Sequence, residues 1–200
     1  MTAARNGFFF VLDRVTGEHL LTAPFAETSN WTLGVNAKGQ PIHDPTKDPS
    51  VGGSLVSMNT AGAVNWQPPA FSPQTGLFYL PVSATYAMYY LTETDPRGAM
   101  GIGGMTQTAL SPNGTFLGAI DYKTGKFAWK HQYPGTGSGG NGVLTTAGGL
   151  VFAGDISGSL VGYDATDGTI LWHSRIGSVT NAPETYTIDG RQHVDDRRSL

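Results

Sequence analysis

A nine-residue pattern occurs twice in this chain and strongly limits the folds that it can adopt. The pattern is an Asp, a Gly four residues later and a Trp eight residues later, and it spans residues 121–129 and 164–172. The two copies start 43 residues apart. Repeat units of about 40–50 residues are typical of the four-stranded blades of β-propellers. A decayed third copy begins at Asp13, with Leu21 in place of the Trp.

Each copy has the composition of a strand, a tight turn and a second strand. The Asp side chain can accept a hydrogen bond from the backbone N–H two residues later, and Gly adopts the positive φ that closes a hairpin. The two tryptophans, Trp129 and Trp172, are expected to lie between successive blades as large apolar plates. We therefore predict an all-β chain, a partial β-propeller of four-stranded antiparallel blades with tryptophan-docking repeats.

Composition supports strands and excludes several functions. Only 14% of the residues are charged and 28 are glycine, which favours strands and turns over helices. The net charge of −3 gives no reason to expect nucleic acid or an anionic membrane as a partner. The absence of cysteine excludes disulfides and thiolate metal sites. No apolar run is long enough to span a bilayer, and the N-terminal residues lack the layout of a signal peptide.

The apolar runs divide the chain into blade segments. We expect the end of one blade at residues 7–25, a second blade at 65–133, a third at 141–177 and the start of a fourth at 183–194. Residues 195–200 form a tail that leaves the pattern. Blades bury their faces only against neighbouring blades, so a partial propeller leaves apolar faces exposed.

Two long segments separate these blades and are interpreted as loops. The first is residues 26–64, which are rich in Gly, Asn, Asp and Pro, and the second is residues 83–114, an insertion in the second blade. Loops of this length in a compact domain usually carry function or disorder. Helix content is expected to be close to zero.

Three segments, in the same order, carry a resemblance to a known family. They are residues 5–14, 65–73 and 146–154, with the sequences RNGFFFVLDR, NWQPPAFSP and TAGGLVFAG. Together with the Trp-bearing repeats they resemble the pyrroloquinoline-quinone (PQQ)-dependent alcohol dehydrogenases, relatives of methanol dehydrogenase, to about Val194. The resemblance implies an eight-bladed propeller that oxidises alcohols in the periplasm with PQQ and a calcium or lanthanide ion. It also implies a cytochrome c as electron acceptor.

The resemblance assigns cofactor-binding roles to Arg5, Asn65 and Trp66. Arg5 matches a family position filled by Arg or Lys, which reaches the quinone oxygens; a fixed cation there stabilises the negative charge that the quinone gains with the hydride. Asn65 and Trp66 match an Asn-Trp pair that lines the cofactor pocket. An amide can donate to a cofactor oxygen, and an indole offers a flat face and one N–H. The alternatives are a surface arginine, a turn asparagine and a core tryptophan.

Other features depart from the family. There the catalytic Asp base, the metal ligands and a vicinal disulfide lie upstream of the segment that matches Arg5, so none is expected in this chain. Gly140 occupies a position where the family usually has a pocket Trp, and Asp195-Asp196-Arg197-Arg198 follows where an apolar strand would continue. We therefore expect the C-terminal part of a PQQ-dependent alcohol dehydrogenase, inactive in isolation. The alternative is a non-catalytic propeller that serves as a scaffold or binding module.

Other chemical motifs are weak or absent. Residues 135–140 formally fit GxGxxG, but an apolar strand and no helix follows, so we expect no dinucleotide site. The five histidines are scattered without metal-ligand spacing, and no Gly-x-Ser-x-Gly elbow occurs. The chain is accordingly expected to contain no catalytic residue and no metal ligand.

Overall fold

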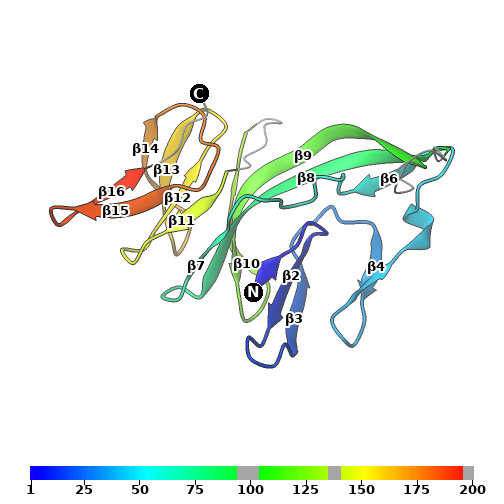
Figure 1. Cartoon of the computed structure of the whole chain (residues 1–200), viewed down its shortest axis with the longest axis horizontal. Helices are drawn as coiled ribbons and strands as arrows, with labels where there is room; N and C mark the ends of the chain where they lie inside the picture. The colour runs from blue at the N-terminus through cyan, green and yellow to red at the C-terminus, as the bar shows by residue number, and fades with distance from the viewer. Residues whose placement is uncertain (94–103, 135–140, 196–200) are drawn as a thin grey trace.

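The computed structural model describes residues 1–93, 104–134 and 141–195, and within them the chain is built from β-strands (Figure 1). The strands form five antiparallel sheets in these described ranges. The helical element among them is a short 3₁₀ turn, η1 (Pro45–Lys47). No helix in the described parts of the chain has the length and apolar character needed to cross a bilayer. The prediction of an all-β chain is therefore confirmed.

The first sheet has three strands in the order β1-β2-β3. These are β1 (Thr2–Ala3), β2 (Phe8–Leu12) and β3 (His19–Pro24). The turn between β2 and β3 is the decayed repeat. The Asp13 carboxylate accepts the backbone N–H of Val15 at 2.8 Å, and Gly17 closes the turn with φ of 75°. The Asp and Gly of the pattern therefore have the turn-forming roles that their chemistry predicts.

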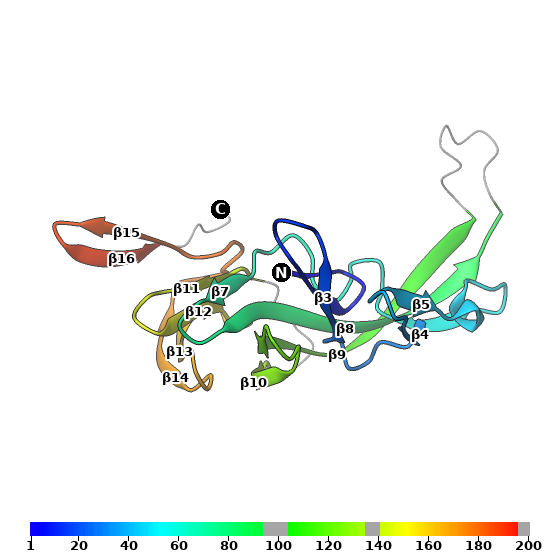
Figure 2. The same ribbon diagram turned by 90° about the horizontal axis from the view of Figure 1, so that it is seen from below.

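The second sheet contains two strands much longer than a propeller blade needs. Its order is β10-β9-β8-β6, and β7 also pairs with β8. The strands are β6 (Ser54–Ser57), β7 (Ala70–Ser72), β8 (Leu77–Leu91), β9 (Met105–Asp121) and β10 (Phe127–Gln132). Figure 2 shows the far ends of β8 and β9 projecting from the rest of the molecule as a hairpin.

The described residues of both segments interpreted as loops contain strands. Within residues 83–114, the pairing of β8 with β9 runs on from Ser83↔Thr115 to Leu91↔Met105. Residues 26–64 contain the hairpin of β4 (Thr32–Val35) and β5 (Pro41–His43), η1 and β6. The loop interpretation was wrong because the Gly-rich and Pro-containing stretches between these strands obscured short strands that depend on long-range pairing.

The third sheet has the regular order β11-β12-β13-β14. Its strands are β11 (Val143–Thr145), β12 (Leu150–Gly154), β13 (Ser159–Asp164) and β14 (Ile170–Arg175). A separate hairpin of β15 (Glu184–Ile188) and β16 (Arg191–Asp195) follows. Asp195, the first residue of the predicted off-pattern tail, is the last residue of β16, and residues 196–200 lie outside the described residues.

Successive side chains of β8 point to opposite faces of the second sheet, and each face packs in a different core. Phe78 and Leu80 belong to a core shared with the first sheet, in which the Phe9 and Phe78 rings lie 5.2 Å apart. Tyr79, between them in sequence, belongs to a second core shared with the third sheet. This is the period-two alternation of a strand, and it places the three sheets face to face in chain order (Figure 1).

The two repeat tryptophans have different surroundings. Trp129 is 8% exposed, and its indole ring lies between Tyr79 of the second sheet and Tyr163 of the third, at ring-centroid distances of 5.8 and 6.4 Å. Trp172 is 49% exposed and packs edge-on against Phe152 of its own sheet. Trp172 shares a hollow with Val194 and Asp195 of β16, so the described residues do not enclose it between two sheets as they do Trp129.

Candidate functional site

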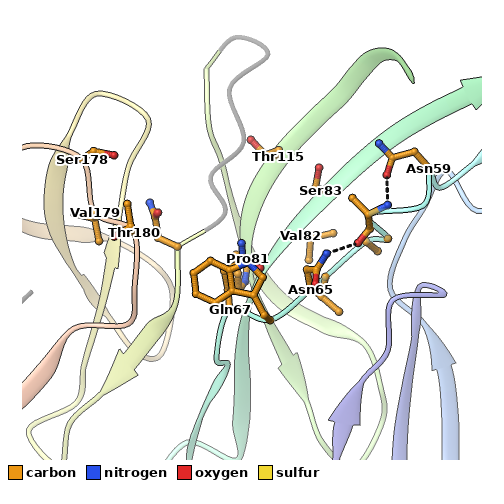
Figure 3. A pocket seen from close by; sticks show the side chains of 16 residues that line it. Asn59, Asn65, Gln67, Pro81, Val82, Ser83, Thr115, Ser178, Val179 and Thr180 are labelled. Carbon is orange, nitrogen blue, oxygen red and sulfur yellow. Dashed lines mark hydrogen bonds between the residues drawn. The ribbon is translucent and has the colours of Figure 1, made fainter. Parts of the chain in front are cut away.

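The connections at one end of the second and third sheets enclose a hollow of about 400 Å³ (Figure 3). One wall is the segment from Asn59 to Gln67, which leads into β7. The opposite walls come from Val82 and Ser83 of β8, Thr115 of β9 and the connection after β14. A hollow of this size, formed between neighbouring sheets, falls in the range of small-molecule sites.

Asn65 and Trp66 both line this hollow. The Asn65 side-chain amide donates to the main-chain oxygen of Ala61 at 3.0 Å, and the Asn59 carboxamide oxygen accepts the Ala61 N–H at 2.9 Å (Figure 3). Trp66 is 63% exposed, so much of its indole surface is open to solvent. The structure therefore brings these two sequence-predicted residues together and holds the turn before them with two asparagine side chains.

Arg5 reaches the same turn from the connection between β1 and β2. Its Nε donates to the Ala61 oxygen at 3.3 Å, and its Nη2 donates to the Thr60 oxygen. Arg5 lines a neighbouring hollow of about 270 Å³, which shares Asn59 and Gly62 with the larger one. Arg5 and Asn65 thus meet at one carbonyl oxygen, while their free surfaces face adjoining hollows.

Gly62 makes the close approach of Arg5 possible. Its φ is 81°, in the left-handed region, and a Cβ at this position would lie 2.8 Å from the Arg5 carbonyl oxygen. The same oxygen accepts the Ala63 N–H at 2.9 Å. A side chain at position 62 would therefore push the first sheet away from the turn.

The extended hairpin of β8 and β9 holds the other side of the turn. The Asn59 N–H donates to the Thr85 oxygen at 3.0 Å, and the Ser83 N–H donates to the Ala63 oxygen at 2.8 Å. The Tyr89 hydroxyl donates to the Met58 oxygen at 3.2 Å. Burial raises the pKa of Tyr89, so this hydroxyl keeps its proton and remains a donor at neutral pH.

Sequence reasoning missed the contribution of this hairpin. Gln107 of β9 bonds to Thr60 through both ends of its carboxamide. Residue type offers no signal for such a role, and Gln107 falls in the segment that was interpreted as a loop.

Gly140 and the glycine-rich residues 135–140 lie outside the described residues. Elsewhere in ranges 1–93, 104–134 and 141–195, no group of three or more His, Asp or Glu side chains is placed to hold a metal ion. The described part of the site is therefore a polar turn with one cation, Arg5, and one exposed aromatic ring, Trp66.

The chain is similar to quinoprotein alcohol dehydrogenases over nearly its whole length. It is 38% identical to the quinoprotein alcohol dehydrogenase PedH of Pseudomonas putida, covering 96% of this chain and 34% of the relative. It is 36% identical to the quinohemoprotein alcohol dehydrogenase of Comamonas testosteroni, covering 96% of this chain and 29% of the relative. A family model described as outer membrane protein assembly factor BamB matches residues 104–192.

Solved structures show the same relationship. The quinohemoprotein alcohol dehydrogenase ADHIIG of Pseudomonas putida superposes with a TM-score of 0.84 at 33% identity, covering 97% of this chain and 31% of that one. A europium-containing methanol dehydrogenase superposes with a TM-score of 0.79 at 28% identity, covering 95% of this chain and 34% of that one. The sheets therefore form part of a β-propeller. By sequence and fold the chain matches the PQQ-dependent quinoprotein alcohol dehydrogenases over about a third of their length.

Proposed function

We propose that this chain forms one wall of the PQQ site of an alcohol dehydrogenase. The observation that supports this most directly is the meeting of Arg5 and Asn65 at the Ala61 oxygen. This meeting point adjoins a hollow whose lining includes Trp66. These are the three residues that the resemblance assigns to the cofactor, and they come from two separate connections of the propeller.

The chemistry of these side chains fits a planar, anionic quinone. A guanidinium offers five N–H donors, so the bonds of Arg5 to Thr60 and Ala61 leave donors for a quinone oxygen. Asn65 has a second amide hydrogen and a carbonyl oxygen beyond its bond to Ala61. The exposed indole of Trp66 supplies a flat surface for stacking.

When bound, PQQ supplies the oxidant that accepts a hydride from the alcohol carbon. Arg5 contributes a fixed positive charge that stabilises the negative charge arising on the quinone. We infer that the catalytic base and the ligands of a calcium or lanthanide ion come from other parts of the propeller, since the matches cover only about a third of each relative. The proposed electron acceptor is a cytochrome c, the proposed compartment is the periplasm, and the isolated chain is proposed to be inactive.

Complementation tests this proposal. The chain is co-expressed with the part of PedH that its match does not cover, and this complemented protein is supplied with PQQ and calcium or a lanthanide. We expect saturable PQQ binding and dye-linked oxidation of an alcohol, and we expect Arg5→Ala to reduce both. A folded complex that neither binds PQQ nor oxidises alcohols overturns the proposal.

The second candidate is a non-catalytic propeller that serves as a scaffold or binding module. It is favoured by the match of residues 104–192 to the BamB family and by Gly140, which replaces a pocket Trp. Sequencing the DNA that flanks the coding region distinguishes the two candidates. An in-frame segment with further Trp repeats and an Asp base favours the enzyme, whereas a genuine start and stop around these residues favours the scaffold.

A further inference from the structure

The carboxamide of Gln107 makes two hydrogen bonds to Thr60. Its Oε1 accepts the Thr60 N–H at 3.1 Å, and its Nε2 donates to the Thr60 hydroxyl at 2.6 Å. The two residues are 47 positions apart in the chain. Bonds through both ends of the amide fix the position of the Thr60 backbone and the rotamer of its side chain.

Thr60 is also bound by Arg5, through a different atom. The Arg5 Nη2 donates to the Thr60 carbonyl oxygen, across 55 positions of sequence. Thr60 therefore links Gln107, on the projecting hairpin of the second sheet, to Arg5, in the connection between β1 and β2. Among the described residues, the Gln107 carboxamide hydrogen bonds to Thr60 and not to Arg5, so any effect that it has on the guanidinium passes through Thr60.

The turn has little freedom to move independently of these two partners. An added Cβ at Gly62 would lie 2.6 Å from the Arg5 Cβ, so the turn and Arg5 are already in close contact. The Asn59 N–H bond to Thr85 anchors the turn to β8 on the residue before Thr60. Displacing the Thr60 carbonyl would therefore change the position of the Arg5 guanidinium.

We propose that Gln107 is a positioning residue for Arg5, holding the Thr60 carbonyl where it orients the guanidinium beside the cofactor hollow. This inference rests on the proposed PQQ site and deepens it, because it places a determinant of cofactor affinity on the β8–β9 hairpin. A long arginine side chain has many rotamers, and a fixed carbonyl acceptor reduces the entropy lost when the guanidinium meets its ligand. The role requires a side chain with both a donor and an acceptor, which methionine of similar length lacks.

A double-mutant cycle tests the route through Arg5. PQQ dissociation constants are measured for the complemented protein, for Gln107→Met, for Arg5→Met and for the double variant. We expect Gln107→Met to weaken PQQ binding about fivefold when Arg5 is present and to have no effect when Arg5 is already replaced. An equal effect in both backgrounds, or no effect in either, overturns the proposal.

A second measurement needs no cofactor and so separates this proposal from the proposed function. Hydrogen exchange of the Arg5 Nε–H and the Thr60 N–H is followed by NMR in the 200-residue chain. Gln107→Met is expected to accelerate exchange at both groups. Faster exchange at Thr60 with unchanged exchange at Arg5 overturns the positioning role, whether or not the complemented protein binds PQQ.

The matched control is Gln74→Met. Gln74 also donates a side-chain hydrogen bond to a backbone oxygen, that of Ala147, at 3.0 Å. It lines neither hollow described above. We expect this variant to leave PQQ affinity and the exchange of both groups unchanged, and an effect as large as that of Gln107→Met contradicts a specific role for Gln107.

Discussion

Trp129 of the second sheet donates its indole N–H to the main-chain oxygen of Ala165 in the third sheet, at 3.1 Å. Its ring also lies against Gly168, where an added Cβ would be 2.6 Å from the indole. At the preceding interface, an added Cβ at Gly125 would lie 2.3 Å from the Ala23 Cβ and 3.2 Å from Leu21, so Leu21 is near the turn glycine but Ala23 is closer. For the first two copies of the pattern, the residue eight positions after the Asp therefore lies near the turn glycine of the following copy.

This geometry predicts that the turn glycines differ in their tolerance of alanine. Gly168→Ala is expected to cost about 2–4 kcal/mol of unfolding free energy, because the left-handed φ of 76° and the clash with Trp129 add together. Gly17→Ala, with a similar φ of 75° and open space around it, is expected to cost about 1–2 kcal/mol. Urea unfolding of both variants measures the difference, and equal losses would show that the contact with Trp129 has no energetic weight.

The two repeat tryptophans are expected to differ in the same experiment. Trp129→Ala removes a buried ring and a hydrogen bond and should cost about 3–5 kcal/mol. Trp172→Ala removes a half-exposed ring and should cost less than about 2 kcal/mol in this chain. A greater loss of unfolding free energy for Trp172→Ala than for Trp129→Ala would contradict this prediction.

Stability should depend on the protonation of His131. Burial among aromatic rings lowers the pKa of His131 from its ordinary value of 6.5. The unfolded chain therefore binds the His131 proton more readily than the folded chain does. The contribution of neutral His131 to the unfolding free energy is complete above the unfolded pKa and is lost as the pH falls through 6.5 toward the folded pKa. His131→Phe keeps a ring but cannot titrate, so its unfolding free energy should vary less between about pH 5 and 7. If the unfolding free energies of the wild type and His131→Phe change equally with pH, His131 does not cause the pH dependence.

The outer face of the third sheet should drive association of the isolated chain. Ile170, Leu171 and Trp172 of β14 are all about half exposed. Adjacent apolar residues exposed on one strand favour self-association. Leu171→Glu is expected to reduce the average mass measured by light scattering, whereas Leu33→Glu, at an exposed apolar position on β4, should change it less. A wild-type chain that runs as a sharp monomer contradicts this expectation.

The repeats were predictable because their determinants are local. Asp121 and Gly125 form a turn through bonds within a few residues, as Asp164 and Gly168 do, and each turn lies between apolar runs long enough for one strand. The extension of β8 and β9 was not predictable in this way. Its strands are separated by a segment containing Pro96 and several glycines, and their pairing depends on contacts far apart in sequence.

The candidate site shows the same limit. The roles of Arg5 and Asn65 came from a family resemblance, and no local pattern indicated that both would bond to the Ala61 oxygen. The Asn65 bond spans only four positions, but the Arg5 bond joins residues 56 positions apart, so the meeting point depends on the tertiary fold. Gln107 was missed because its role depends entirely on where β9 places it.

The most direct test of the central claim is the affinity of the complemented protein for PQQ, measured by tryptophan fluorescence titration with and without Arg5→Ala. We predict saturable binding that Arg5→Ala weakens at least about tenfold, because the variant loses a charged hydrogen-bond donor. Binding of equal strength in both proteins, or a lack of binding in a correctly folded complex, would contradict it.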